Sequence, residues 1–79
     1  MESVTVYILI QTGMGVAGEV ARKVLDIDGT ISADTVTGHY DVIVKASAPT
    51  IVQLGKLVSE IQQIDGVKRT LTNTVVDLP

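Results

Sequence analysis

Apolar residues follow two different spacings along the first half of the chain. Val4 to Ile10 is a run of β-branched and aliphatic residues, which is typical of a β-strand. From Val16 the apolar residues recur every three or four positions, which predicts an amphipathic helix. We expect this helix to end at Asp28-Gly29, with the glycine in the left-handed C′ position. Ile31 to Val36 then predicts a weaker strand, and Tyr40 to Ala46 a strong one.

The second half of the chain repeats this order. Ser47-Ala48-Pro49 predicts the start of a helix, because proline is favoured in the first turn. Ile51 to Ile64 has apolar residues at helical spacing, and Val67 to Val76 has the composition of a final strand. The tripeptide Ile-Asp-Gly closes each predicted helix, at 27–29 and again at 64–66. The predicted order is therefore βαββαβ.

Two interleaved βαβ halves predict an α+β, ferredoxin-like sandwich. We expect one four-stranded antiparallel sheet of order 4-1-3-2, with both helices on one face. Since 79 residues suffice for one small core, the prediction is a single domain over residues 1–79.

The predicted strands carry apolar residues on both faces of the sheet. Val6 and Ile8 point one way, whereas Tyr7 and Leu9 point the other, and Ile43 likewise opposes its strand neighbours. The face away from the helices therefore carries aliphatic surface that a monomer leaves in water. We expect a sheet-to-sheet homodimer, and possible assembly into something larger.

Composition excludes several classes of protein. The net charge is −3, from nine acidic and six basic residues, and no basic stripe typical of nucleic-acid binding is visible. There is no cysteine, which excludes disulfides and cysteine-based zinc sites. The longest apolar run, Val4 to Ile10, is too short to span a bilayer, and no signal peptide is apparent. We expect a cytoplasmic protein without metal or cofactor.

Polar residues gather on the turn that precedes the strongest strand. Gly38 permits a positive φ, and Thr37, His39, Tyr40 and Asp41 surround it. A turn held by a rigid strand suits a small-ligand site, although any hairpin has the same features.

His39 and Asp41 each have two interpretations. His39 is the only histidine, and an enzyme would use it as a general base, but a solvated turn residue is the favoured interpretation. Asp41 lies among apolar strand residues, where an unpaired carboxylate is costly to bury. It is equally compatible with an ion pair to Lys68 or Arg69 and with binding of a ligand ammonium group.

Two further patterns were weighed. Thr70, Thr72 and Thr74 share one face of the last strand; they fit the β-propensity of an edge strand best, and secondly a polar pocket. Gly13-Met14-Gly15 follows the first strand, but it lacks the lysine of a P-loop and the third glycine of a dinucleotide fingerprint.

Together these residues resemble a known family. Thr37-Gly38-x-Tyr40-Asp41-x-Ile43-Val44-Lys45, followed by Ile64-x-Gly66-Val67-x-x-Thr70-x-Thr72, is similar to the effector-binding (RAM) domain of the Lrp/AsnC, or feast/famine, transcription regulators. The resemblance implies sheet-to-sheet dimers, larger assemblies that are commonly octamers, and small effectors, usually amino acids. It places the effector between dimers, near the turn and the last strand, which gives the following ligand-binding residues: Thr37, Gly38, His39, Tyr40, Asp41, Thr70, Thr72, Asn73 and Thr74.

The resemblance also implies a role in transcription regulation. Because no helix-turn-helix precedes the first strand, we expect a stand-alone member that senses a ligand or co-assembles with a full-length regulator, without contacting nucleic acid or membrane itself. Two alternatives remain open. One is a dimeric α+β-barrel enzyme of monooxygenase or isomerase type, which needs His39 inside an enclosed cavity. The other is a ligand-free, partner-recruiting module, which needs Asp41 in a salt bridge.

Overall fold

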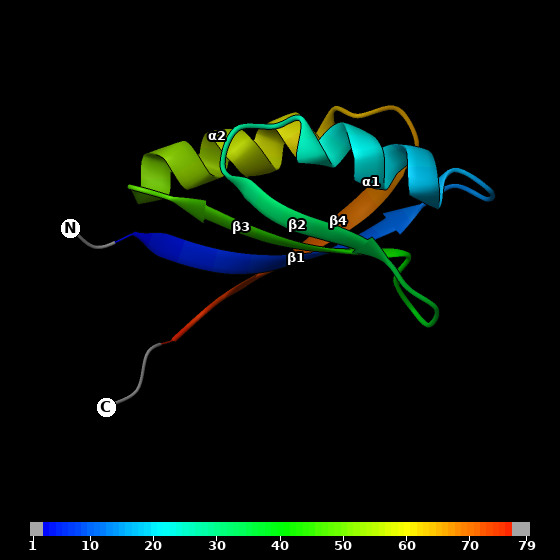
Figure 1. Ribbon diagram of the computed structural model, residues 1–79, viewed down its shortest axis with the longest axis horizontal. Coiled ribbons are helices and arrows are strands. Elements are labelled where there is room, and N and C mark those ends of the chain that lie inside the picture. The colour runs from blue at the N-terminus through cyan, green and yellow to red at the C-terminus, as the bar shows by residue number, and fades with distance from the viewer. Residues whose placement is uncertain (1–2, 77–79) are drawn as a thin grey trace.

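A four-stranded antiparallel sheet with two helices on one face forms the protein (Figure 1). The computed structural model describes residues 3–76. The strand order is β2-β3-β1-β4, which is the predicted 4-1-3-2 order, and all three pairings are antiparallel. The predicted ferredoxin-like architecture is therefore confirmed. The elements are β1 (Val4–Thr12), α1 (Ala17–Leu25), β2 (Thr30–Thr35), β3 (Val42–Ala48), α2 (Ile51–Gln62) and β4 (Val67–Thr74).

The core lies between the sheet and the helices. Alternate residues of the two central strands face the helices and are fully buried, because β1 and β3 each have a neighbour on both sides. The three buried positions of each helix recur at the spacing of a helical face. The core residues include Val6, Ile8, Ile10, Val42, Val44, Val20, Ala21, Val24, Leu54, Leu57 and Ile61.

The opposite side of the sheet, here called the outer face, is also apolar. Leu9 is paired with Ile43 on one side and Leu71 on the other, so three aliphatic side chains cross the sheet in one row. Leu71 is 47% exposed and Tyr7 is 41% exposed, while Leu9 and Ile43 are half-buried. The prediction of two apolar faces is confirmed.

Helix α2 begins later than the sequence suggested. The Ser47-Ala48-Pro49 prediction was wrong, because β3 continues as far as Ala48, which pairs with Val4 of β1. The helix instead begins after Thr50, whose side-chain oxygen accepts a hydrogen bond from the Gln53 N–H at 3.2 Å. Thr50 therefore satisfies one of the free N–H groups of the first turn.

The two Ile-Asp-Gly glycines lie beyond the helix ends rather than at C′. The helices end with C-caps at Asp26 and Gln63, so Gly29 and Gly66 each fall three residues later. Both have positive φ, of 100° and 102°. A Cβ on Gly29 would lie 2.8 Å from Leu57 Cδ1 and 2.9 Å from the Ser47 carbonyl oxygen. The repeated glycine is thus required by the turn that leads into the next strand.

Strand ends also differ from the prediction. β2 begins and ends one residue earlier than expected, and β3 begins at Val42 rather than at residue 40. β4 ends at Thr74, although the Val75 N–H still donates to the Thr5 carbonyl at 2.8 Å. The later start of β3 leaves Tyr40 and Asp41 in the loop, where their side chains are free of the sheet's alternation.

Candidate functional site

The β2–β3 loop, residues 36–41, is fixed to the end of β1 by its backbone. The Val36 N–H donates to the Asp41 carbonyl at 2.9 Å, which closes the loop on itself. The Asp41 N–H donates to the Ile10 carbonyl at 2.8 Å, which attaches the loop to the central strand. Gly38, at the tip, has a φ of 127°, a conformation that L-residues rarely adopt. The loop therefore presents its side chains from a defined position.

The Asp41 carboxylate is hydrogen-bonded to the backbone of β1. Its Oδ2 accepts the Thr12 N–H at 2.8 Å, at the point where the pairing of β1 with β4 shifts register after Gln11. Thr12 is buried, and its hydroxyl donates to the Gly13 carbonyl at 3.0 Å. Within residues 3–76 the ion pair present is Lys23–Glu19, so neither Lys68 nor Arg69 makes the ion pair with Asp41 that the sequence left open.

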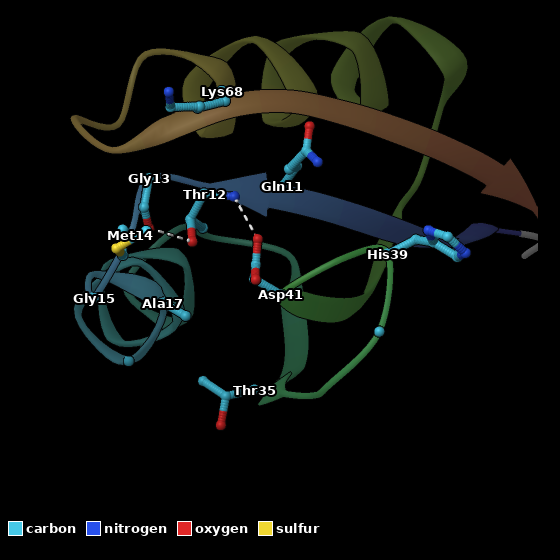
Figure 2. A pocket seen from close by; sticks show the side chains of 12 residues that line it. Gln11, Thr12, Gly13, Met14, Gly15, Ala17, Thr35, His39, Asp41 and Lys68 are labelled. Carbon is cyan, nitrogen blue, oxygen red and sulfur yellow. Dashed lines mark hydrogen bonds between the residues drawn. The ribbon is translucent and has the colours of Figure 1, made fainter.

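An open cavity of about 890 Å³ surrounds Asp41 (Figure 2). Its walls come from the β1–α1 loop, the β2–β3 loop and the start of β4, where Lys68 lies. Lys68 Cε lies 3.8 Å from the place of a Cβ on Gly13, so the lysine stem covers that glycine. A carboxylate and an ammonium group from distant parts of the chain therefore line one cavity. Its volume is within the roughly 300 to 1,000 Å³ typical of small-molecule sites.

His39 is exposed and is directed away from Asp41 in Figure 2. It lines the edge of the first cavity and also a second hollow of about 400 Å³, formed with Gln11, Tyr40 and Arg69. An enzyme that used His39 as a general base would need it inside an enclosed cavity, beside its reacting group. The observed position of His39 does not meet that requirement.

The predicted ligand residues divide between two places. In the β2–β3 loop, Gly38, His39 and Asp41 line the first cavity, and Tyr40 lines the second. Thr37 lies in the same loop.

The four predicted residues of β4 line neither of these cavities. Thr70, Thr72 and Thr74 are paired with Ile10, Ile8 and Val6, which places the threonines on the helix side of the sheet. Thr70 accepts a hydrogen bond from the Gln62 amide at 3.0 Å, and Asn73 is paired with Tyr7 on the outer face.

Several lining residues were not predicted from the sequence. Lys68 was expected only as an ion-pair partner of Asp41, and no residue of the β1–α1 loop was among the predicted ligand-binding residues. The loop lies beside β4 because the Gly13 N–H donates to the Gly66 carbonyl at 2.9 Å. The sequence signal for this part of the site was the pair of glycines, Gly13 and Gly15, between the first strand and the first helix. Val16, the N-cap residue of α1, makes no side-chain capping hydrogen bond, and the small first-turn residues Ala17 and Gly18 line this side of the cavity.

Residues 3–76 contain neither a candidate metal site nor a helix able to cross a membrane. No group of three or more His, Cys, Asp or Glu side chains is placed to hold a metal ion there. In that same part of the chain, neither helix has the length and hydropathy needed to cross a bilayer.

The fold and the cavity are those of a candidate ligand-binding domain, with two opposite charges lining one cavity at the end of a ferredoxin-like sheet. The family comparison agrees with this class. The family described as the Lrp/AsnC ligand binding domain matches residues 5–79, and the chain belongs to that family.

Solved structures of similar fold include chains of nearly the same length and longer chains. A hypothetical protein of Pyrococcus horikoshii has a TM-score of 0.86 and 32% identity, over 95% of this chain and 92% of that one. AsnC of E. coli has a TM-score of 0.85 and 28% identity, over 96% of this chain but only 52% of AsnC.

One enzyme contains a similar segment. The homocitrate synthase of Sulfolobus acidocaldarius is 32% identical over 57 residues, which are 72% of this chain. The aligned segment is only 12% of the synthase. The chain therefore resembles one small part of that enzyme.

Proposed function

We propose that this chain is a regulatory module that senses a small zwitterionic effector, an amino acid, in the cavity between Asp41 and Lys68. The observation that carries the proposal is the pairing of these opposite charges in one open cavity of a chain that belongs to a ligand-binding family. A free amino acid has the same two charges, an ammonium and a carboxylate group. Charge-assisted hydrogen bonds to both ends would orient it.

The geometry of Asp41 suits the ammonium group. The hydrogen bond from the Thr12 N–H occupies one lone pair of Oδ2 and fixes the carboxylate plane. The remaining lone pairs, including both of Oδ1, can accept from a ligand ammonium. Lys68 is exposed at the opposite wall, where its ammonium can meet the ligand carboxylate. The threonines and Asn73 of β4 remain predicted ligand residues that a monomer does not bring to this cavity.

We further propose that the outer face packs against the outer face of a second copy. The row of Leu9, Ile43 and Leu71 is the apolar surface that supports this, because isologous contact of two such faces removes it from water. Such dimers would then assemble into larger rings, of octamer type, or co-assemble with a full-length Lrp/AsnC regulator. In either case the module acts in transcription through its partner.

A second candidate function is regulation of an enzyme rather than of transcription. The similarity to a segment of a homocitrate synthase supports it, since a related sequence is there part of a metabolic enzyme. Both candidates use the same effector cavity. Identifying the protein that co-purifies with the effector-bound chain distinguishes them: a DNA-binding regulator supports the first, and a metabolic enzyme supports the second.

The decisive experiment is thermal unfolding of the chain in the presence of each of the twenty amino acids. An effector at 100 times its dissociation constant adds about 2.7 kcal/mol to the free energy of unfolding. For a domain of this size that corresponds to an increase of roughly 10 °C or more in the unfolding midpoint. Light scattering on the same samples reports whether the effector changes the size of the assembly.

Asp41→Asn is the matched control variant. Its amide oxygen can still accept the Thr12 N–H, so the unfolding midpoint without ligand should change little. The negative charge for the ligand ammonium is lost, so the midpoint shift with effector should fall by more than half. An equal shift in the variant and the native chain would contradict a role for Asp41 in the site.

A further inference from the structure

We infer that the effector has an uncharged aliphatic side chain. This inference rests on the proposed function, because it assumes that an amino acid binds between Asp41 and Lys68. It then follows from the charges and the shape of the remaining cavity wall.

In the proposed complex, the two charged side chains of the cavity bind the ammonium and carboxylate groups of the amino acid. Asp41 and Lys68 are the charged groups among the lining residues within 3–76. Of the other polar lining residues, Gln11, Thr12 and Thr35 are neutral, and His39 lies at the edge of the cavity. A charged effector side chain would find no further side chain of opposite charge among these lining residues once the ligand backbone has used Asp41 and Lys68. A zwitterion with a neutral side chain balances the cavity without any third charged group.

Arg69 lies outside this balance. It lines the second hollow together with Tyr40 and is not among the residues that line the first cavity. His39, which borders both hollows, is directed away from Asp41 (Figure 2). Neither Arg69 nor His39 is therefore placed beside Asp41, where it could pair with an acidic side chain of the effector.

The wall formed by the β1–α1 loop and the first turn of α1 is apolar and built from small residues. Gly13, Gly15, Ala17 and Gly18 leave it shallow, and nothing lies within 4 Å of a Cβ placed on Gly15 or Gly18. Met14 projects from this wall with its side chain fully exposed, at 101%. A long apolar side chain held in water at the edge of a cavity gains from contact with an apolar ligand group. The wall thus provides both the space and the partner for an aliphatic side chain.

The test is calorimetric titration of the full chain with amino acids of similar size and different charge. Leucine, asparagine and aspartate form one set, and methionine, glutamine, glutamate and lysine form another. We expect the apolar member of each set to bind at least tenfold more tightly than the charged members. Within the series alanine, 2-aminobutyrate and norvaline, each added methylene should raise the affinity about fourfold, which is ~0.8 kcal/mol per buried methylene.

Variants of Met14 test whether the wall formed by the β1–α1 loop and the first turn of α1 causes the preference for aliphatic side chains. Because Met14 is fully exposed, its substitution should leave the unfolding midpoint unchanged. Met14→Ser should reduce the gain per methylene, Met14→Lys should shift the preference toward acidic amino acids, and Met14→Leu should retain the native preference. An unaltered preference in the serine and lysine variants would overturn the role of this wall.

The outcomes separate the two proposals. If aspartate, glutamate or lysine binds as tightly as leucine or methionine, the inference about the side chain is wrong while the effector cavity stands. If no amino acid of any charge binds, the proposed function fails and the inference fails with it. Tight binding of the aliphatic members alone supports both.

Discussion

Gly29 and Gly18 show that the same residue type has opposite effects at two positions. Gly29 has a φ of 100°, and a Cβ there would lie 2.9 Å from a backbone oxygen of β3 that cannot move freely. Gly18 is an exposed residue inside α1, with nothing near the place of its Cβ. The fold thus requires the glycine at position 29, whereas the glycine at position 18 destabilises helix α1.

Gly29→Ala should therefore lower the free energy of unfolding by about 2–3 kcal/mol, because it combines a left-handed conformation with steric overlap. Gly18→Ala should raise the free energy of unfolding by about 0.5–1 kcal/mol, because alanine is the better helix former. Chemical denaturation of both variants measures the two changes. Destabilisation by Gly18→Ala would show that the exposed side of α1 contacts something in solution.

Only some of the cavity residues could be predicted from the sequence. The loop from Thr37 to Asp41 was identified from its residue types, since glycine and polar side chains before a strong strand indicate a turn with recognition capacity. Lys68 was not, because its place in the cavity depends on the pairing of β4 with β1 and on the register shift after Gln11. The β4 threonines were chosen by their alternation, but alternation alone does not say which face of the sheet they occupy.

At the scale of the elements, α2 depends on its cap. Thr50 is the residue whose hydroxyl oxygen accepts the Gln53 N–H, and the helix that follows supplies Leu54, Leu57 and Ile61 to the core. Thr50→Ala should lower the free energy of unfolding by about 1 kcal/mol, whereas Thr50→Ser should be nearly neutral. Thermal unfolding is sufficient, because ~1 kcal/mol moves the midpoint by roughly 4–8 °C in a domain of this size. Equal unfolding midpoints for the alanine and serine variants would show that the Thr50 hydroxyl does not stabilise the start of α2.

The number, type and order of the elements were predictable, and their ends were not. Apolar spacing distinguishes strand from helix over many residues, so each element rests on several observations. An end depends on one or two local contacts. β3 extends past the predicted helix start because Ala48 finds a partner in Val4, and it begins late because the Asp41 backbone is bonded to Ile10. Such contacts join segments that are distant in sequence.

At the scale of the whole molecule, the proposed sheet-to-sheet dimer makes the outer face the surface that should decide the state of assembly. Leu71 and Leu25 are matched probes, since they are 47% and 48% exposed but lie on the outer face and on α1 respectively. Leu71→Lys should therefore reduce the mass measured by light scattering to that of the monomer, because a charge in a sheet-to-sheet contact is desolvated.

Leu25→Lys should leave the mass of the assembly unchanged. Dissociation by both variants would indicate that the helices, not the outer face, form the contact. Monomeric native chain would refute the dimer altogether. Since neither leucine belongs to the core cluster, both variants should retain the fold, which circular dichroism checks.

The direction of the strands has a consequence for how this domain is combined with others. β1 starts and β4 finishes at the end of the sheet opposite to the β1–α1 and β2–β3 loops (Figure 1). A polypeptide joined in line with either strand would emerge away from the cavity beside Asp41, so gene fusion at either position should preserve access to it. Similar segments occupy 52% of a transcription regulator and 12% of a biosynthetic enzyme. If the cavity binds the proposed effector, this geometry lets one such domain be joined to proteins whose outputs differ.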